Sequence, residues 1–261
     1  MSWALVTGAS AGIGTELARE CAKDGRSLIL VARRKDRMIE LAKELIAKHP
    51  GIKVEVIEQD LSKPGAAAKV YSATQKITHE LDILINNAGF GILGAFPESN
   101  LDKQLELIDL NVRVLVELTG LFLPAMKVRK LGYILNVGSV AGFQPGPFMN
   151  TYYASKAFVN SFSEALHQEL EGSGVSCTDL CPGPVETEFG EVAGAKGSRL
   201  FKKVSKVTAA GVAAMAYKGM KCRQALVIPG IQAKLIPQFV RISPRALVRK
   251  TSGWLIRSAA T

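Results

Sequence analysis

Short runs of β-branched and aliphatic residues alternate along the chain with longer segments whose apolar residues recur at helical spacing. Helices are expected between successive runs, the first two at 12–23 and 36–48. The expected strands are 3–7, 28–32, 54–57, 83–85, 133–137, 175–180 and 225–228. Continuous apolar strands joined by helices require a parallel sheet covered on both faces. The pattern therefore predicts a doubly wound (Rossmann) α/β fold with a parallel sheet of about seven strands flanked by helices.

No linker or internal repeat interrupts residues 1–230, so we expect one domain there. Residues at about 187–207, rich in small and basic side chains, are expected to form a flap after the sixth strand. Residues 231–261 contain two prolines and are expected to form a basic, amphipathic C-terminal extension.

Composition places the chain among ordinary globular proteins, with 48% hydrophobic and 21% charged residues. No apolar stretch reaches the ~18 residues needed to span a bilayer, and the first residues lack the basic region of a signal peptide. The four cysteines show no metal-ligand spacing and are too few for a disulfide framework. We therefore expect reduced thiols, no metal site and a cytoplasmic protein.

The formal charge of +10 is unevenly distributed. Residues 1–191 hold 19 basic and 23 acidic side chains, whereas residues 192–261 hold 14 basic ones and no acidic one. A basic protein can bind nucleic acid, but neither a basic face interleaved with aromatic residues nor a reading element is present. Nucleic acid is therefore not expected as a partner.

A glycine-rich turn, Thr7 to Gly14, connects the first strand to the first helix with the spacing Gly-x-x-x-Gly-x-Gly. Such a turn allows a pyrophosphate to approach the helix N-terminus. Tight strand-to-helix turns also use glycine for steric reasons alone, so the turn is weak evidence by itself. The end of the second strand is more informative, because Arg33, Arg34 and Lys35 stand where a dinucleotide fold selects its cofactor. A carboxylate there would bind ribose hydroxyls, whereas arginine pairs with a 2′-phosphate. A solvated basic loop is the alternative, and the position favours NADP(H).

Tyr152 and Lys156 lie four residues apart on a predicted helix and so project from one face. A phenol has a pKa of about 10, and an ammonium one turn away favours its ionised form. Tyr153 points about 100° away and has no lysine four residues later. Ser139 ends the fifth strand, where ligands bind in open α/β sheets, and its hydroxyl can hold a substrate carbonyl oxygen. Each of these residues also has a purely structural explanation when taken singly.

Together, these motifs make residues 3–230 resemble the short-chain dehydrogenase/reductase family of the Tyr-x-x-x-Lys type. Further matches are the Asp60-Leu61 pair, the Asn-Asn-Ala-Gly motif at 86–89 and the segment 182–187. The resemblance implies that Asp60 meets adenine, that 182–187 closes over the nicotinamide, and that Lys156 also binds the nicotinamide ribose. It implies the catalytic set Asn111, Ser139, Tyr152 and Lys156, with Asn111 holding a water in the proton path. The implied cofactor contacts are Gly8, Ser10, Gly12, Ile13, Gly14, Arg33, Arg34, Asp60, Leu61, Asn87, Ala88, Gly89, Tyr152, Lys156, Pro182, Gly183, Val185 and Thr187.

The intact catalytic set favours an NADPH-dependent reductase, with Tyr152 as the acid/base, over an NADP-binding regulatory or interaction protein without turnover. The apolar segment 142–149, with Phe189 and Phe201, favours a hydrophobic ketone or secondary alcohol as substrate. The same residues could pack against another subunit, and a homo-oligomer, dimer or tetramer, is expected. Residues 137–189 are similar to DltE-like, 3-oxoacyl-CoA and hydroxysteroid reductases, so a 3-oxoacyl thioester of coenzyme A or a carrier protein, or a hydroxysteroid, is the alternative substrate.

The basic C-terminal part carries a second set of expectations. Cations in or after the flap could attract an anionic carrier: Arg199, Lys202, Lys203 and Lys206. After a helix start at Ser243-Pro244, apolar and basic residues alternate at helical spacing. The expected stripe is Leu247, Val248, Thr251, Trp254 and Leu255, interspersed with Arg245, Arg249 and Lys250. Such a helix either lies on an anionic membrane surface or docks on its own domain or a partner subunit, and both remain open.

Overall fold

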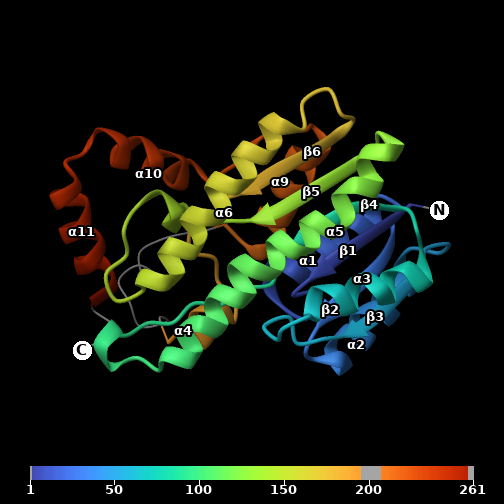
Figure 1. Ribbon diagram of the computed structural model, residues 1–261, viewed down its shortest axis with the longest axis horizontal. Helices are drawn as coiled ribbons and strands as arrows, with labels where there is room; N and C mark the ends of the chain where they lie inside the picture. Colours follow the sequence, from blue (N-terminus) through green and yellow to red (C-terminus); the bar gives the residue numbers. More distant parts are fainter. Residues whose placement is uncertain (1, 195–206, 258–261) are drawn as a thin grey trace.

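The computed structural model describes residues 2–194 and 207–257. Seven parallel strands form one sheet in the order β3-β2-β1-β4-β5-β6-β7 (Figure 1). The strands are β1 (Trp3–Thr7), β2 (Ser27–Ala32), β3 (Val54–Glu58), β4 (Leu81–Asn86), β5 (Gly132–Val137), β6 (Val175–Leu180) and β7 (Leu226–Val227). The predicted doubly wound α/β fold is confirmed. The seventh strand is shorter than expected, because only Leu226 and Val227 pair with β6.

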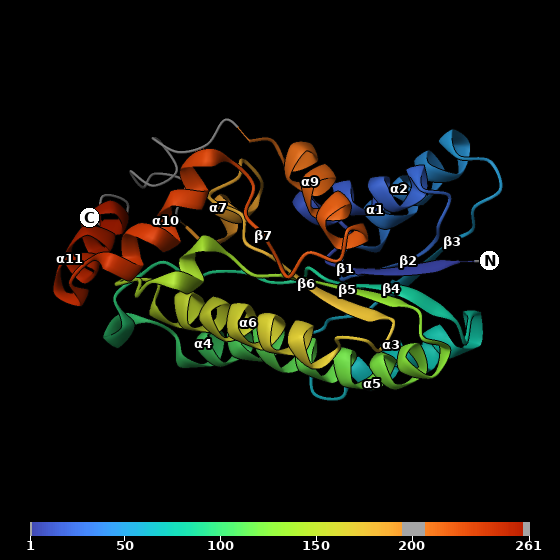
Figure 2. The ribbon, with the colours of Figure 1, turned by 90° about the horizontal axis from the view of Figure 1, so that it is seen from above.

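Helices cover both faces of the sheet (Figure 2). One face carries α1 (Gly12–Lys23), α2 (Lys35–Lys48) and α9 (Ala209–Lys221). The other carries α3 (Ala66–Ile77), α4 (Leu101–Ile108), α5 (Val114–Arg129) and α6 (Asn150–Glu169). Short turns of helix lie in the connections: η1 (Phe96–Glu98), η2 (Asp109–Arg113), η3 (Val140–Phe143) and α7 (Phe189–Val192). The last two helices, α10 (Ile231–Ile242) and α11 (Arg245–Arg257), lie at the end of the molecule toward which the strands point (Figure 1).

Strands β1 and β2 are apolar at nearly every position because helices cover both faces of the sheet, as the sequence pattern predicts. Alternate residues of β1 enter two different cores, with Val6 packed under α1 and Leu5 packed on the side of α3 and α5. Because successive side chains of a strand point to opposite faces, a strand covered on both sides must be apolar at every position. The edge strand β3 is only half-buried.

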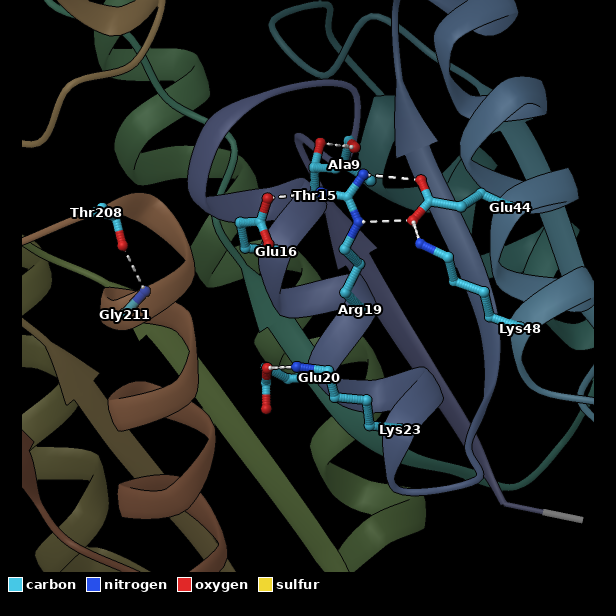
Figure 3. Close-up of polar contacts among 10 residues, drawn as sticks. All are labelled: Ala9, Thr15, Glu16, Arg19, Glu20, Lys23, Glu44, Lys48, Thr208 and Gly211. Atoms are coloured by element: carbon cyan, nitrogen blue, oxygen red, sulfur yellow. Dashed lines mark hydrogen bonds and ion pairs between the residues drawn. The ribbon is translucent and has the colours of Figure 1, made fainter.

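Polar contacts join the helices on the α1 side of the sheet (Figure 3). Arg19 of α1 donates from Nη2 to Glu44 Oε2 of α2 at 2.8 Å, and Lys48 donates to the same carboxylate. These hydrogen bonds lower the pKa of Glu44 to about 2. Thr208 begins α9 by accepting a hydrogen bond from the Gly211 amide at 3.1 Å. Of these contacts, the Arg19–Glu44 pair joins α1 to α2, whereas the other two stabilise single helices.

The C-terminal part differs from expectation. The predicted stripe on α11 is not the buried side of the helix, which consists of Val248, Ser252 and Ile256. Leu247 and Trp254 lie on the exposed side instead. The buried side is therefore turned around the helix axis relative to the predicted stripe, and Val248 is the one residue that belongs to both. The flap expected at 187–207 is described at residues 187–194 and 207, and its expected residues Arg199, Phe201, Lys202, Lys203 and Lys206 lie outside the described residues. Among the described residues, no helix is both long and apolar enough to cross a bilayer.

Candidate active site

A cavity of about 400 Å³ opens at the carboxyl edge of the sheet. Most of the residues proposed from the sequence line it: Gly8, Ser10, Gly12, Ile13, Arg33, Arg34, Asp60, Leu61, Asn87, Ala88, Gly89, Ser139, Tyr152, Lys156, Pro182, Gly183, Val185 and Thr187. Gly14 and Asn111 do not line the cavity and lie buried behind it. The parallel topology brings these distant segments to one edge.

The glycine-rich turn holds its shape for identifiable steric reasons. Gly8 and Gly12 have φ angles of 66° and 59°, in the left-handed region that favours glycine. A Cβ added to Gly14 would lie 2.3 Å from the Gly8 carbonyl oxygen, so the helix approaches the turn only with glycine there. The first turn of α1 has no side-chain cap and no acidic residue. Its amide groups therefore face the cavity ready for an anion such as a pyrophosphate.

Hydrogen bonds clamp the end of β1 to the end of β4. Thr7 Oγ1 donates to the Ile85 carbonyl at 3.1 Å and accepts from the amides of Asn87 at 2.9 Å and Ala88 at 3.1 Å. The Asn87 side chain donates to the Thr7 carbonyl at 2.9 Å. The motif at 86–89 therefore fixes the floor of the cavity beside the glycine turn.

At the far end of the cavity, the Arg34 guanidinium already holds an anionic group. Arg34 donates from Nη1 to Glu188 Oε2 at 2.7 Å and from Nε to Ser10 Oγ at 3.2 Å. Arg37 pairs with the same carboxylate, and the two arginines lower the pKa of Glu188. This site therefore fits a phosphate group, which takes up the same fork of donors. Asp60 accepts hydrogen bonds from Ser62 on the same side, and these lower the pKa of Asp60 although burial raises it.

Tyr152 lies in the cavity wall beside Phe189, with 5.2 Å between the ring centroids. Burial raises the pKa of the Tyr152 phenol well above its usual value, while the Ser139 hydroxyl acts in the opposite direction. The Lys156 ammonium lies 5.9 Å from the centre of the Tyr152 ring and donates to the Val137 carbonyl at 2.6 Å. The sequence predicts that this ammonium favours the phenolate, and this stays a prediction; the largest influence on the pKa of the Tyr152 phenol in the structure is burial. Burial also lowers the pKa of Lys156, to about 8.

Ser139 is held by its backbone as well as by its side chain. Asn160 of α6 accepts from the Ser139 amide at 3.3 Å and donates to the Ser139 carbonyl at 3.0 Å. The Ser139 hydroxyl accepts from the Ala141 amide at 3.1 Å and lies 3.4 Å from the Pro182 carbonyl. The hydroxyl is therefore positioned next to Tyr152 before any substrate binds.

Asn111 lies in the π-helical turn η2, between α4 and α5. Its side chain accepts from the Phe90 amide at 3.1 Å and donates to the Phe90 carbonyl and to Ser155 Oγ, both at 3.0 Å. These bonds tie the loop after β4 to the helix that carries Tyr152 and Lys156. In this structure Asn111 therefore acts as an anchor behind the cavity.

Asp179 of β6 is a fully buried carboxylate that the sequence pattern did not single out. Its Oδ2 atom accepts from the Cys181 thiol at 3.0 Å, and its Oδ1 atom lies beside Gly138. Burial raises the pKa of Asp179 to about 7, which the Cys181 thiol and the Lys156 charge partly counter. A buried carboxyl group that touches the Cys181 thiol and feels the charge of Lys156 has no signal in the periodicity of the sequence.

The sequence also gave no indication of Glu188 as a partner of Arg34, or of Ile236 in the cavity wall. The first pair is separated by 154 positions, and Ile236 comes from α10, beyond the last strand. Contacts between segments that are far apart in sequence form only in the folded chain, so no local sequence motif predicts them.

Comparison with known proteins agrees with this geometry. The family model "short chain dehydrogenase" matches residues 2–197. A very-long-chain 3-oxoacyl-CoA reductase of Anas platyrhynchos is 34% identical over 199 residues, which cover 73% of this chain and 62% of that protein. The chain thus spans less than two thirds of this relative's length.

Solved structures match over nearly the whole chain. A short-chain dehydrogenase from Sphingobium yanoikuyae, in complex with NADPH, is 32% identical with a TM-score of 0.83, covering 95% of both chains. A bulky-bulky ketone specific alcohol dehydrogenase from Comamonas testosteroni is 29% identical with a TM-score of 0.76, covering 94% of this chain and 96% of that one.

Proposed function

The chain belongs to the short-chain dehydrogenase family, and we propose that it transfers hydride between NADP(H) and a hydrophobic ketone or secondary alcohol. The observation that carries this proposal is the convergence of Ser139, Tyr152 and Lys156 on one cavity that the glycine turn and Arg34 also line. Those residues come from strand ends and helices that are far apart in sequence. A regulatory protein without turnover would not need an acid, a hydrogen-bond donor and a cation at one point.

The residues of the cavity fit NADP(H), which supplies the hydride when bound. The amide groups at the start of α1 would hold the pyrophosphate, and Arg33 and Arg34 would hold the 2′-phosphate. Asp60 would contact adenine and Lys156 the nicotinamide ribose, and both residues line the cavity. The NADPH complex of the related Sphingobium yanoikuyae enzyme supports this choice of cofactor.

The catalytic side chains act on the substrate oxygen. In the reducing direction, the Tyr152 hydroxyl donates its proton to the carbonyl oxygen while Ser139 donates a hydrogen bond to the same atom. Because its pKa is raised, the Tyr152 phenol is protonated near neutral pH, and the charge of Lys156 is what would ease loss of the proton. Lys156 has a pKa of about 8 and is therefore an ammonium at pH 7, where it stabilises the negative charge that Tyr152 acquires.

The substrate end of the cavity is apolar. Met149, Phe189, Val192 and Ile236 line the cavity, and the Gln144 side chain is a polar group in the same wall. A hydrophobic ketone therefore fits better than a sugar or a hydroxy acid, as the bulky ketone specificity of the Comamonas testosteroni relative supports. The Anas platyrhynchos relative supports a 3-oxoacyl thioester as the alternative, and hydroxysteroids belong to the same apolar class.

We also propose that residues 1–230 form the NADP-binding domain, that 231–261 extend it, and that the enzyme is a cytoplasmic homo-oligomer, a dimer or tetramer. Because Ile236 of the extension lines the cavity, the extension completes the substrate site. Removal of residues 231–261 is therefore expected to affect the KM for the ketone more than that for NADPH.

The proposal is tested by NADPH oxidation with aromatic ketones, 3-oxoacyl thioesters and oxosteroids, measured by absorbance. We expect turnover of at least one apolar class, and its loss in Tyr152→Phe with NADPH affinity retained, because that variant lacks only the transferred proton. Tyr133→Phe is the matched control, since a lysine also lies over the Tyr133 ring but outside the cavity. Turnover that persists in Tyr152→Phe would contradict the assignment.

A further inference from the structure

Helix α10 carries two apolar faces on opposite sides. Ala233 and Val240 are buried against the rest of the protein. On the other side, four large apolar side chains follow one line along the helix and are 51–83% exposed. They are Ile231, Leu235, Phe239 and Ile242. An outward apolar line of this length is unusual on a water-facing helix, whose outer face is normally polar.

Helix α11 extends the same feature. Its buried side is Val248, Ser252 and Ile256, and Leu247 and Trp254, 46% and 56% exposed, lie on the opposite side. The two helices are consecutive in the chain and lie together at one end of the molecule (Figure 1). We call the six exposed apolar residues of α10 and α11 the C-terminal apolar face.

The segment that forms this face, residues 231–257, is basic and contains no carboxylate. Residues 231–257 contain six basic side chains and no Asp or Glu. They are Lys234, Arg241, Arg245, Arg249, Lys250 and Arg257, and all six are exposed. No carboxylate of residues 2–194 or 207–257 forms an ion pair with any of them. The Arg257 guanidinium lies over the Phe148 ring, 5.3 Å from its centre.

We propose that the C-terminal apolar face docks on a lipid bilayer whose surface carries anionic headgroups. Apolar side chains that include Phe239 and Trp254 enter the boundary between headgroups and acyl chains, while the surrounding cations meet the phosphates. The charge decides between a bilayer and a second copy of this chain. Two copies joined through the same face would place six cations against six, which like-charge repulsion opposes.

The face also has a position that matters for the substrate. Ile236, on the same helix, lines the cavity, so α10 separates the proposed bilayer contact from the substrate site. A lipophilic ketone dissolved in the bilayer would reach the cavity beside this helix. This consequence rests on the proposed function, whereas the docking itself does not.

Flotation of the full-length protein with vesicles tests the docking without any turnover. Vesicles of phosphatidylcholine and phosphatidylglycerol are compared with vesicles of phosphatidylcholine alone. We expect flotation with the anionic vesicles only, and its weakening by added salt, because exposed charges are screened. Equal behaviour of the two vesicle types, or flotation with neither, would overturn the proposal.

Variants separate the apolar and the charged contributions. The double variant Leu235→Glu/Phe239→Glu is expected to abolish flotation, whereas Val128→Glu, at an 85% exposed valine of α5, should leave it unchanged. Lys234→Gln/Arg241→Gln is expected to weaken vesicle binding about thirtyfold, at about one kcal/mol per charge. Circular dichroism and the melting temperature check that each variant is folded. If Leu235→Glu/Phe239→Glu floats like the wild type, the proposal is overturned. If its only effect is to turn a dimer into a monomer, the face binds protein instead of lipid, which also overturns the proposal.

Discussion

The catalytic cavity and the C-terminal apolar face both depend on cations, but they hold them in opposite ways. In the cavity, Lys156 is buried and its ammonium is bonded to the Val137 carbonyl, and Arg34 is bonded to Ser10 and Glu188. On α10 and α11 the cations are exposed, and their segment contains no carboxylate.

The difference indicates what each region can bind. A cation with a fixed acceptor has one orientation, so it acts on one atom of one ligand and needs no reorganisation during the reaction. Exposed cations around an apolar face have no fixed acceptor, and their summed field acts on a large charged surface instead. The following variants should change one region and leave the other unaffected.

The largest effect is expected from Lys156→Met. Loss of the ammonium removes the charge that stabilises ionised Tyr152 and leaves the Val137 carbonyl without its donor. We expect kcat for ketone reduction to fall by about 10²–10⁴-fold. Steady-state kinetics measure this, and vesicle flotation of the same variant should equal that of the wild type.

Lys221→Met is the matched control for that variant. The Lys221 ammonium lies 5.4 Å from the centre of the Tyr133 ring, a contact similar to that of Lys156 with Tyr152 but outside the cavity. A fall in kcat in both variants would show that loss of a lysine near a tyrosine harms the fold rather than the chemistry.

A second effect concerns the buried carboxyl group of Asp179, behind the cavity. Burial raises the pKa of Asp179 to about 7, so the folded protein binds this proton more tightly than the unfolded chain does. The free energy of unfolding should therefore fall as the pH rises from about 4 to about 7. This fall should be absent in Asp179→Asn. The free energy of unfolding of the variant, relative to that of the wild type, should therefore rise by up to about 4 kcal/mol between about pH 4 and pH 7. Urea unfolding at a series of pH values measures the difference.

Asp24→Asn should change the pH dependence of stability in the opposite direction from Asp179→Asn. Although burial raises the pKa of Asp24, hydrogen bonds from Arg26, Tyr217 and Lys221 lower it to about 2. The ionised Asp24 carboxylate adds to the free energy of unfolding at pH values above the pKa of Asp in the unfolded chain, and this contribution is lost as the pH falls. We therefore expect Asp24→Asn to be less stable than the wild type at neutral pH. Identical pH dependence in the two variants would contradict the assignment of Asp179 as a buried charge.

A smaller effect is expected at the phosphate end of the cavity. Arg34→Ala removes a charged donor, and the KM for NADPH should rise about tenfold to a hundredfold, with little change in the KM for NADH. Glu188→Gln should act in the other direction, because it frees Arg34 and Arg37 from their carboxylate. Kinetics with both cofactors measure these shifts, and an equal loss of NADPH and NADH binding in Arg34→Ala would contradict a 2′-phosphate site.

The features that could be predicted from the sequence are local. Tyr152 and Lys156 share a helix face because they are four residues apart, and the glycine turn is readable because positive φ angles require glycine. Strand ends could be placed at one edge because parallel strands all end there. The same reasoning could not find Asp179, because β6 also contains Ser176 and Thr178, so one more polar residue in that strand does not stand out in the sequence.

The sequence alone determined the strand and helix order of residues 3–230, the doubly wound sheet and the motifs at its carboxyl edge, because these depend on periodicity and short spacing. Tertiary structure decided which charges meet and which apolar residues remain in contact with solvent. Arg34 meets Glu188, and Val248 is buried while its neighbour Leu247 is exposed, only because of how distant segments pack. The charge of residues 192–261 was visible in the sequence, but the apolar line on α10 became visible only when the opposite side of the helix was covered.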